Sequence, residues 1–288
     1  MTLGRLAAVA AFCVFALTGT ANAAPALWEV SDADSKVWLF GSMHVLPPTI
    51  TWRTPTLETA LTEAEQVYFE ADIGPLGQIG IMLKGIGMAF NAPRTPWTDK
   101  LTAAQTQTLA AAIEPLGLTV PQLAAYAPWL AEGVVEDKVM TGLGFRGNLG
   151  VDATLQAELP KEKKAFFESA GQQMDMMGAD SEEVQIRRLL AAIAEIDKMP
   201  AELTSLAEAW ASGNDAEITA QMADDPGLDQ AFEKTMLLDR NQKWTTAISA
   251  LLAQNHQDLI VVGAAHLVGD GSVTDLLGKA GFTVRRIQ

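Results

Sequence analysis

The sequence predicts an α/β fold with a mixed, largely parallel sheet, chemically active strand ends and a helical insertion. Two apolar runs of β-type residues, 37–40 and 259–262, lie near opposite ends of the chain. Strands that are apolar throughout are buried on both faces, as in a parallel sheet covered by helices. Each run is followed at once by a Gly-x-x-His motif, ending in His44 and in His266. Because the chain has only three histidines, this repetition is its most informative feature.

The other strands are predicted from short apolar runs bounded by turn residues. A β-hairpin is expected first, with strands at 26–30 and 36–40 joined by the polar turn 31–35. Further strands are expected at 66–71, 160–167 and 282–287. Strands at both ends and in the middle of a chain, with helices between them, are typical of the α/β class.

Helical periodicity dominates from about 101 to 254, which we interpret as a helical insertion in a single domain spanning 24–288. Helices are expected at 101–116, 121–140, 181–198, 201–211, 215–223 and 228–254. Thr54, followed by proline, predicts the start of a short helix before the insertion, and Ser272 predicts the start of another after it. The segment 73–98, rich in Gly, Met and Pro, is either an apolar helix or a mobile flap.

Residues 1–23 have the pattern of a secretory signal peptide: Arg5, an apolar core at 6–17 and small residues before the cleavage site. The mature protein is therefore expected to begin near Ala24 and to be periplasmic or secreted, with no stable membrane span after cleavage. The only cysteine, Cys13, lies in the segment that is removed. This excludes disulfides, zinc–thiolate sites and a cysteine nucleophile in the mature chain.

The net charge is −15 at pH 7. Such an acidic chain is repelled by the phosphates of nucleic acids, so nucleic acid is excluded as a partner. The length suits one large domain with a substantial apolar core. The sequence leaves the oligomeric state open.

The two Gly-x-x-His motifs place imidazoles where a parallel sheet collects its ligands. Gly41 and Gly263 allow the chain to turn sharply at the strand ends. A lone histidine there is best explained as a turn cap, but the matched pair His44 and His266 favours one shared site. Glu70 ends a third strand, and two imidazoles with one carboxylate suit a divalent metal such as Mn²⁺, Co²⁺ or Zn²⁺. The alternative is that Glu70 is only solvated beyond its strand.

Three other charged residues are candidates for a supporting role. Asp152 precedes an apolar helix and is interpreted as its N-cap, or else as a carboxylate that orients a histidine. Glu168 ends a strand and is a candidate ligand or acid–base group. Arg240 falls on an apolar stripe of its helix, so its charge needs a partner among Glu70, Asp152 and Glu168, or stabilises an oxyanion. The third histidine, His256, is interpreted as a solvated residue at a helix end.

Taken in order, these residues resemble the TraB/GumN family, which is related to the Tiki metalloproteases and, more distantly, to the erythromycin-esterase and ChaN-like proteins. The resemblance covers essentially the whole mature chain. It is carried by both Gly-x-x-His motifs, by Phe69-Glu70-Ala71-Asp72, by Gly150-Val151-Asp152, by Glu168 and by Arg240-Asn241. It implies that His44, Glu70 and His266 form the catalytic centre of a metal-dependent hydrolase.

Three hypotheses follow from the residues and the resemblance. The first is an exported metal-dependent hydrolase, acting as a peptidase, in which His44, Glu70 and His266 activate water and Arg240 stabilises negative charge. The second uses the same residues for metal-independent ester hydrolysis. The third is a non-catalytic binding protein for haem or a metal complex, with the histidines as axial ligands. The expected substrate is accordingly a peptide or a small-molecule ester.

Overall fold

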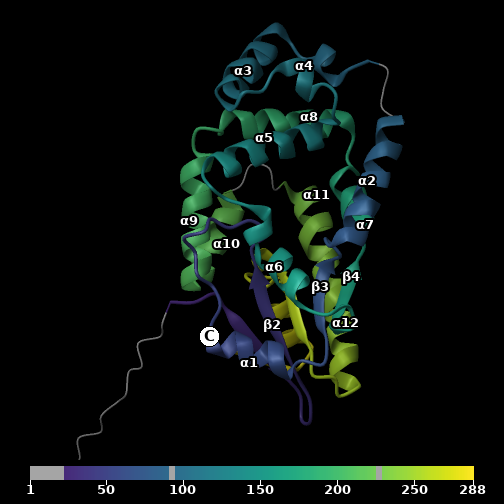
Figure 1. Ribbon diagram of the computed structural model, residues 1–288, viewed down its shortest axis with the longest axis vertical. Coiled ribbons are helices and arrows are strands. Elements are labelled where there is room, and N and C mark those ends of the chain that lie inside the picture. Colours follow the sequence, from purple (N-terminus) through teal and green to yellow (C-terminus); the bar gives the residue numbers. More distant parts are fainter. Residues whose placement is uncertain (1–22, 91–94, 225–228) are drawn as a thin grey trace, which may run out of the picture.

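The computed structural model describes residues 23–90, 95–224 and 229–288 (Figure 1). The predicted signal peptide, with Cys13, lies outside the described residues except for Ala23. Within the described ranges, no helix combines the length and the apolar character that crossing a bilayer requires.

In the described part of the chain, six strands form one mixed sheet in the order β4-β3-β5-β2-β1-β6. They are β1 Leu27–Ser31, β2 Lys36–Ser42, β3 Val67–Ala71, β4 Lys164–Glu168, β5 Leu259–Gly263 and β6 Thr283–Arg286. Strands β2, β5, β3 and β4 run parallel, whereas β1 pairs antiparallel with β2 and with β6. The predicted α/β class with a mixed, largely parallel sheet is confirmed.

Helices surround the sheet and form a large block beyond its carboxyl edge (Figure 1). The helices are α1 Pro55–Glu63, α2 Pro75–Phe90, α3 Ala103–Ile113, α4 Val120–Leu123, α5 Pro128–Gly142, α6 Val151–Glu158, α7 Ala170–Met177, α8 Glu182–Ala194, α9 Met199–Ser212, α10 Asp215–Asp224, α11 Gln230–Glu233, α12 Asp239–Ala253 and α13 Val273–Lys279. Thr54 and Ser272 cap α1 and α13, as predicted.

The single helix expected at 121–140 is wrong, because the structure divides this segment into α4 and α5. Pro128 has no N–H to donate, and it holds Ala127 before it in an extended conformation, with ψ at 151°. The segment 73–98 was expected to be an apolar helix or a mobile flap, and the structure has the helix α2 there. Several apolar side chains of α2 are exposed.

The single helix expected at 228–254 also differs in detail. Residues 230–253 are helical, but the π-helical turn η5 (Lys234–Leu238) separates α11 from α12, and Leu228 lies outside the described residues. A π-helical turn widens the helix locally and is frequent at functional sites. Here it lies directly before the turn that carries Arg240.

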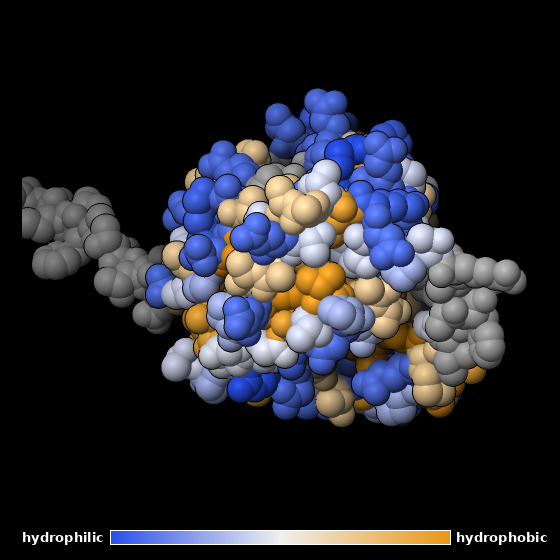
Figure 2. Space-filling model, turned by 90° about the horizontal axis from the view of Figure 1, so that it is seen from above, coloured by the Kyte–Doolittle hydropathy of each residue, from blue (hydrophilic) through white to orange (hydrophobic). Residues whose placement is uncertain are grey.

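Apolar side chains form two clusters in the described residues. The larger cluster packs around the sheet and includes Phe40, Phe69 and Val261. The second lies among α3, α5 and α8, with Leu109 and Leu189 fully buried. This helical block stands away from the sheet in Figure 1, and Figure 2 looks down on that end, where hydrophilic residues surround a small group of apolar ones.

Strand pairing brings the two Gly-x-x-His motifs together. In the parallel register of β2 and β5, Gly41 lies opposite Val262 and Ser42 lies opposite Gly263. Strand β3 flanks β5 on its other side, and β4 flanks β3. All four strands therefore end at one edge, which is the edge where ligands of parallel sheets bind.

One buried hydrogen bond ties helix α9 to the first motif. The indole N–H of Trp210, on α9, donates to the Gly41 carbonyl oxygen at 2.8 Å. Trp210→Phe removes this donor, and we expect it to lower the free energy of unfolding by about 1–3 kcal/mol in urea denaturation. Trp244→Phe is the matched control, because the Trp244 N–H is buried without a partner among the described residues. Equal losses in both variants would contradict this role of the bond.

Candidate active site at the carboxyl edge of the sheet

The predicted site residues surround Gly263, the last residue of β5. A Cβ atom built on this glycine would lie 3.2 Å from Glu70 Oε1, 3.6 Å from His266 Cδ2 and 3.8 Å from His44 Nε2. The side chains come from β3, from the short helix η6 (Ala264–His266) and from the segment after β2. Glu70 Oε1, His266 Cδ2 and His44 Nε2 all lie within 3.8 Å of this one position. The two imidazoles therefore face the same small space.

Glu70 is a buried carboxylate held from three directions. Its Oε1 atom accepts a hydrogen bond from the Gly263 N–H at 2.7 Å, and its Oε2 atom accepts from Arg240 Nη2 at 2.5 Å and from Gln173 Nε2 at 3.0 Å. Burial opposes its ionisation, but the positive charges of Arg240 and His44 and the Gly263 backbone N–H outweigh burial and lower the pKa of Glu70 to about 2. Glu70 is thus an anion of low basicity at neutral pH.

His266 is also buried, and both of its ring nitrogens are engaged. Nδ1 lies 2.6 Å from Asn241 Oδ1, which makes Nδ1 the donor, and Nε2 accepts from Arg240 Nη1 at 3.1 Å. Burial, reinforced by the guanidinium, lowers the pKa of His266 to about 3 in spite of the Glu70 carboxylate. The ring packs against Trp244, with 4.5 Å between ring centroids. His266 is therefore a neutral imidazole without a free nitrogen.

His44 has the opposite environment, because its side chain is 63% exposed. Its Nδ1 atom lies 2.8 Å from Oδ2 of the buried Asp152, which leaves Nε2 facing the point above Gly263. Desolvation acts against the charged ring, but the Asp152 carboxylate and, more weakly, Glu70 raise the pKa of His44 above its ordinary value. A carboxylate on Nδ1 with Nε2 free is the arrangement of a general base.

The N-cap interpretation of Asp152 is wrong. Helix α6 begins at Val151 with Gly150 as its N-cap, so Asp152 lies in the first turn. Its carboxylate contacts His44 instead. The start of α6 is held tightly against the first motif, because Val151 N–H donates to the Met43 carbonyl oxygen at 2.9 Å and a Cβ on Gly150 would lie 2.0 Å from the His44 carbonyl oxygen.

Arg240 lies at the centre of the buried cluster. Its Nε donates to both oxygens of Glu168 at 3.1 Å, its Nη2 donates to Glu70, and its Nη1 donates to His266 and to a main-chain carbonyl of η5 at 2.9 Å. Of the three carboxylates predicted as partners, it contacts Glu70 and Glu168, whereas Asp152 pairs with a histidine. The Arg240 side chain is 4% exposed, and most of its N–H groups donate to protein atoms. Arg240 therefore holds the Glu70 and Glu168 carboxylates in fixed positions.

The donor atoms at this edge are chemically suited to a divalent metal, but their arrangement does not fit one. Arg240 donates to both Glu70 and His266, so a permanent cation already occupies lone pairs that a metal would use. The ligand atoms of His44, Glu70 and His266 do not all lie within 4.8 Å of one another. In the described chain, only one group of three possible ligand residues is that close together, and it lies at the opposite edge of the sheet. A metal would have to displace the guanidinium before it could bind here.

Two contributing residues were assigned no role from the sequence. Gln173, on α7, donates to Glu70, and no local pattern distinguishes it from other surface glutamines. Asn241 accepts from His266 and is 2% exposed. An asparagine next to Arg240 inside a helix was a usable signal, since Asn is unfavourable in a helix interior unless its side chain has a partner.

A cavity of about 900 Å³ lies within the helical block, and no side chain of the site lines it. It is bounded by α5, α8, α9 and α10, and its wall includes Met236, whose carbonyl oxygen accepts a hydrogen bond from Arg240. Apolar side chains line much of it, among them Trp129, Met140, Met199, Met222 and Phe232. A cavity of this size and lining suits a small molecule or a short peptide segment with an apolar part.

Residues 26–286 match the TraB/PrgY/gumN family, which accounts for nearly the whole described chain. The chain belongs to this family. Membership in the TraB/PrgY/gumN family confirms the resemblance that the ordered motifs indicated, and the matched span contains every residue of the site. No curated protein and no solved structure matches the chain.

Replacing Arg240 tests whether it neutralises the buried carboxylates. Arg240→Met keeps much of the side-chain volume but leaves Glu70 and Glu168 without their cation, so we expect the free energy of unfolding to fall by about 3–5 kcal/mol at pH 7. The deficit should shrink toward pH 5, because the pKa of an unpaired buried carboxyl rises and its protonated form needs no counter-ion.

Urea denaturation at both pH values provides the measurement for Arg240→Met. Arg187→Met is the matched control, because the Arg187 side chain is 64% exposed and its variant should be near-neutral at either pH. A loss that is the same at pH 7 and pH 5 would show that Arg240 acts through packing rather than charge.

Proposed function

We propose that this protein is a metal-independent hydrolase of the esterase type, in which His44 is the general base. The observation that carries the proposal is the contrast within the site: Glu70, His266 and Arg240 are buried and held by several hydrogen bonds each, whereas His44 is exposed with Nε2 free. Asp152 holds the ring through Nδ1. Among the site residues in the described chain, His44 alone has a ring nitrogen without a partner, and this nitrogen can accept a proton from water once the ring is neutral.

In the proposed reaction, neutral His44 takes a proton from water while the water oxygen attacks an ester carbonyl. The Asp152 carboxylate stabilises the imidazolium that forms, and the imidazolium then returns the proton to the leaving alkoxide. Glu70 keeps an unused lone pair on Oε1 beside the same point and is suited to orienting the water. Arg240 acts as a positioning residue that fixes Glu70 and His266.

The cavity of the helical block combines apolar side chains with carboxylates and reaches toward the site at Met236, and it supports a substrate with an apolar acyl or alcohol part. The leader pattern at residues 1–23 supports export, so we place the activity in the periplasm or outside the cell. The metal-dependent peptidase is the competing proposal, favoured by the types of donor atom present. Haem ligation by His266 is disfavoured, because both of its ring nitrogens are already engaged.

One set of assays tests both whether hydrolysis needs a metal and whether the two histidines act as one catalytic unit. Hydrolysis of a panel of p-nitrophenyl esters should persist after treatment with EDTA. His44→Ala should lower kcat/KM by at least about 100-fold, and adding His266→Ala should cost little more, because losses within one catalytic unit are not additive. His256→Ala is the matched control, since His256 lies outside the site and its loss should leave ester hydrolysis unchanged.

The chelator result separates the two enzymatic proposals. Loss of activity with EDTA and recovery with Mn²⁺, Co²⁺ or Zn²⁺ would favour the metal-dependent peptidase. Independent, multiplicative losses from the two histidine variants would refute a single catalytic unit.

The pH dependence tests the base role of His44. The ring accepts a proton only when it is neutral, and Asp152 raises its pKa above 6.5, so kcat/KM should rise with pH through this raised pKa. Asp152→Asn removes the charge, which lowers the pKa of His44, moves the rise to lower pH and lowers the plateau because the ring loses its orientation. Asp175→Asn, at a side chain that is 63% exposed, is the control. A fall in kcat/KM over the same pH range would contradict the base role.

A further inference from the structure

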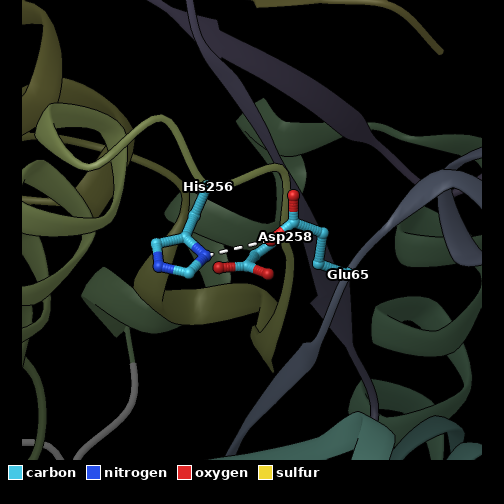
Figure 3. Close-up of side chains that lie close together, drawn as sticks. All are labelled: Glu65, His256 and Asp258. Atoms are coloured by element: carbon cyan, nitrogen blue, oxygen red, sulfur yellow. Dashed lines mark hydrogen bonds and ion pairs between the residues drawn. The ribbon is translucent and has the colours of Figure 1, made fainter.

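A second group of possible metal ligands lies at the amino edge of the sheet, opposite the Gly-x-x-His motifs. Glu65 comes shortly before β3, and His256 and Asp258 come shortly before β5. One ligand atom from each of these three residues lies within 4.8 Å of the other two. Figure 3 shows the Asp258 carboxylate beside the His256 ring, with the Glu65 side chain reaching in from the neighbouring segment.

Asp258 has a buried oxygen that lacks a partner. The residue is 1% exposed, and its Oδ1 atom accepts a hydrogen bond from the Gln66 N–H at 2.9 Å. Its Oδ2 atom is buried with no hydrogen-bond partner in the part of the chain that the structure describes. A buried polar atom left unsatisfied is costly, and the cost is larger for a charged group. A cation beside this carboxylate would remove that cost.

The other two ligands are open to solvent and correctly spaced. The side chains of His256 and Glu65 are 42% and 55% exposed, so an ion can reach them. His256 Nδ1 lies 3.0 Å from Glu65 Oε2. In a tetrahedral zinc site with ligand bonds of about 2.0–2.2 Å, ligand atoms are about 3.3–3.6 Å apart, so an ion could replace the proton shared by these two atoms with a small shift.

Backbone hydrogen bonds already hold the two ligand-bearing segments together. Glu65 N–H donates to the Gln257 carbonyl oxygen at 2.7 Å, and Leu259 N–H donates to the Gln66 carbonyl oxygen at 3.0 Å. The Asp258 carbonyl oxygen accepts from the N–H of Trp38, on the neighbouring strand β2, at 2.9 Å. These bonds fix the spacing of the two segments that carry the ligands.

We propose that Glu65, His256 and Asp258 bind one divalent transition-metal ion of the Zn²⁺ type, with water completing its coordination. One imidazole and two carboxylates form a ligand set that such ions accept. The ion joins the segment before β3 to the segment before β5, so its role is structural. It lies at the opposite ends of these strands from the candidate active site, and metal content and hydrolysis are therefore separate properties of the protein.

Metal titration of the purified protein, first stripped with chelator, tests this site. Zn²⁺ binding is followed by calorimetry, Co²⁺ binding by visible absorption, and Tm is measured with and without each ion. Wild type and His44→Ala should both bind a single equivalent and gain thermal stability, because an ion that binds only the folded state stabilises it. Glu65→Gln, His256→Gln and Asp258→Asn should each weaken binding by at least about tenfold and abolish the rise in Tm.

The matched control is Glu63→Gln, which removes another exposed carboxylate near the site and should bind as wild type does. If only His256→Gln weakens binding, the ion is held adventitiously by a surface histidine and the proposal fails. If His44→Ala removes the ion, the metal belongs to the carboxyl edge and the proposal fails as well. Should Asp258→Asn not fold, the two exposed variants, Glu65→Gln and His256→Gln, decide the outcome.

Discussion

The buried ion pair between Glu70 and Arg240 is the interaction on which the rest of the site depends. It joins β3 to α12 across 170 positions of sequence, and the same guanidinium reaches Glu168 on β4 and His266 after β5. Both partners are almost inaccessible to solvent, and removing one would leave the other as an uncompensated buried charge. The carboxyl edge of the sheet is therefore organised by one cation that several strand ends share.

The two Gly-x-x-His motifs are alike in sequence but differ in chemistry. His44 is exposed and pairs with a carboxylate, which favours its protonated form, whereas His266 is buried against a guanidinium, which favours its neutral form. Environment, and not residue type, sets the proton affinity of an imidazole. The repeated motif thus places one imidazole within reach of solvent and fixes the other through both of its ring nitrogens.

Strands β3 and β5 carry titratable groups at both of their ends, and the two ends differ in how charge is compensated. At the carboxyl edge, the Arg240 guanidinium balances Glu70 and Glu168 within the chain itself. At the amino edge, Asp258 keeps a buried oxygen that has no hydrogen-bond partner among the described residues. An external cation is accordingly better suited to the amino edge, although the two Gly-x-x-His motifs lie at the carboxyl edge.

The sequence by itself determined the apolar strands, the hairpin, the placement of His44 and His266 at strand ends, and the need of Arg240 for a carboxylate partner. These features depend on local periodicity and on residues adjacent in the chain. Only the tertiary structure decided that Asp152 orients a histidine instead of capping its helix, and that Gln173 reaches Glu70. Such contacts join segments about 100 residues apart, so their partners are chosen by packing and by the desolvation of buried charge, which no local pattern records.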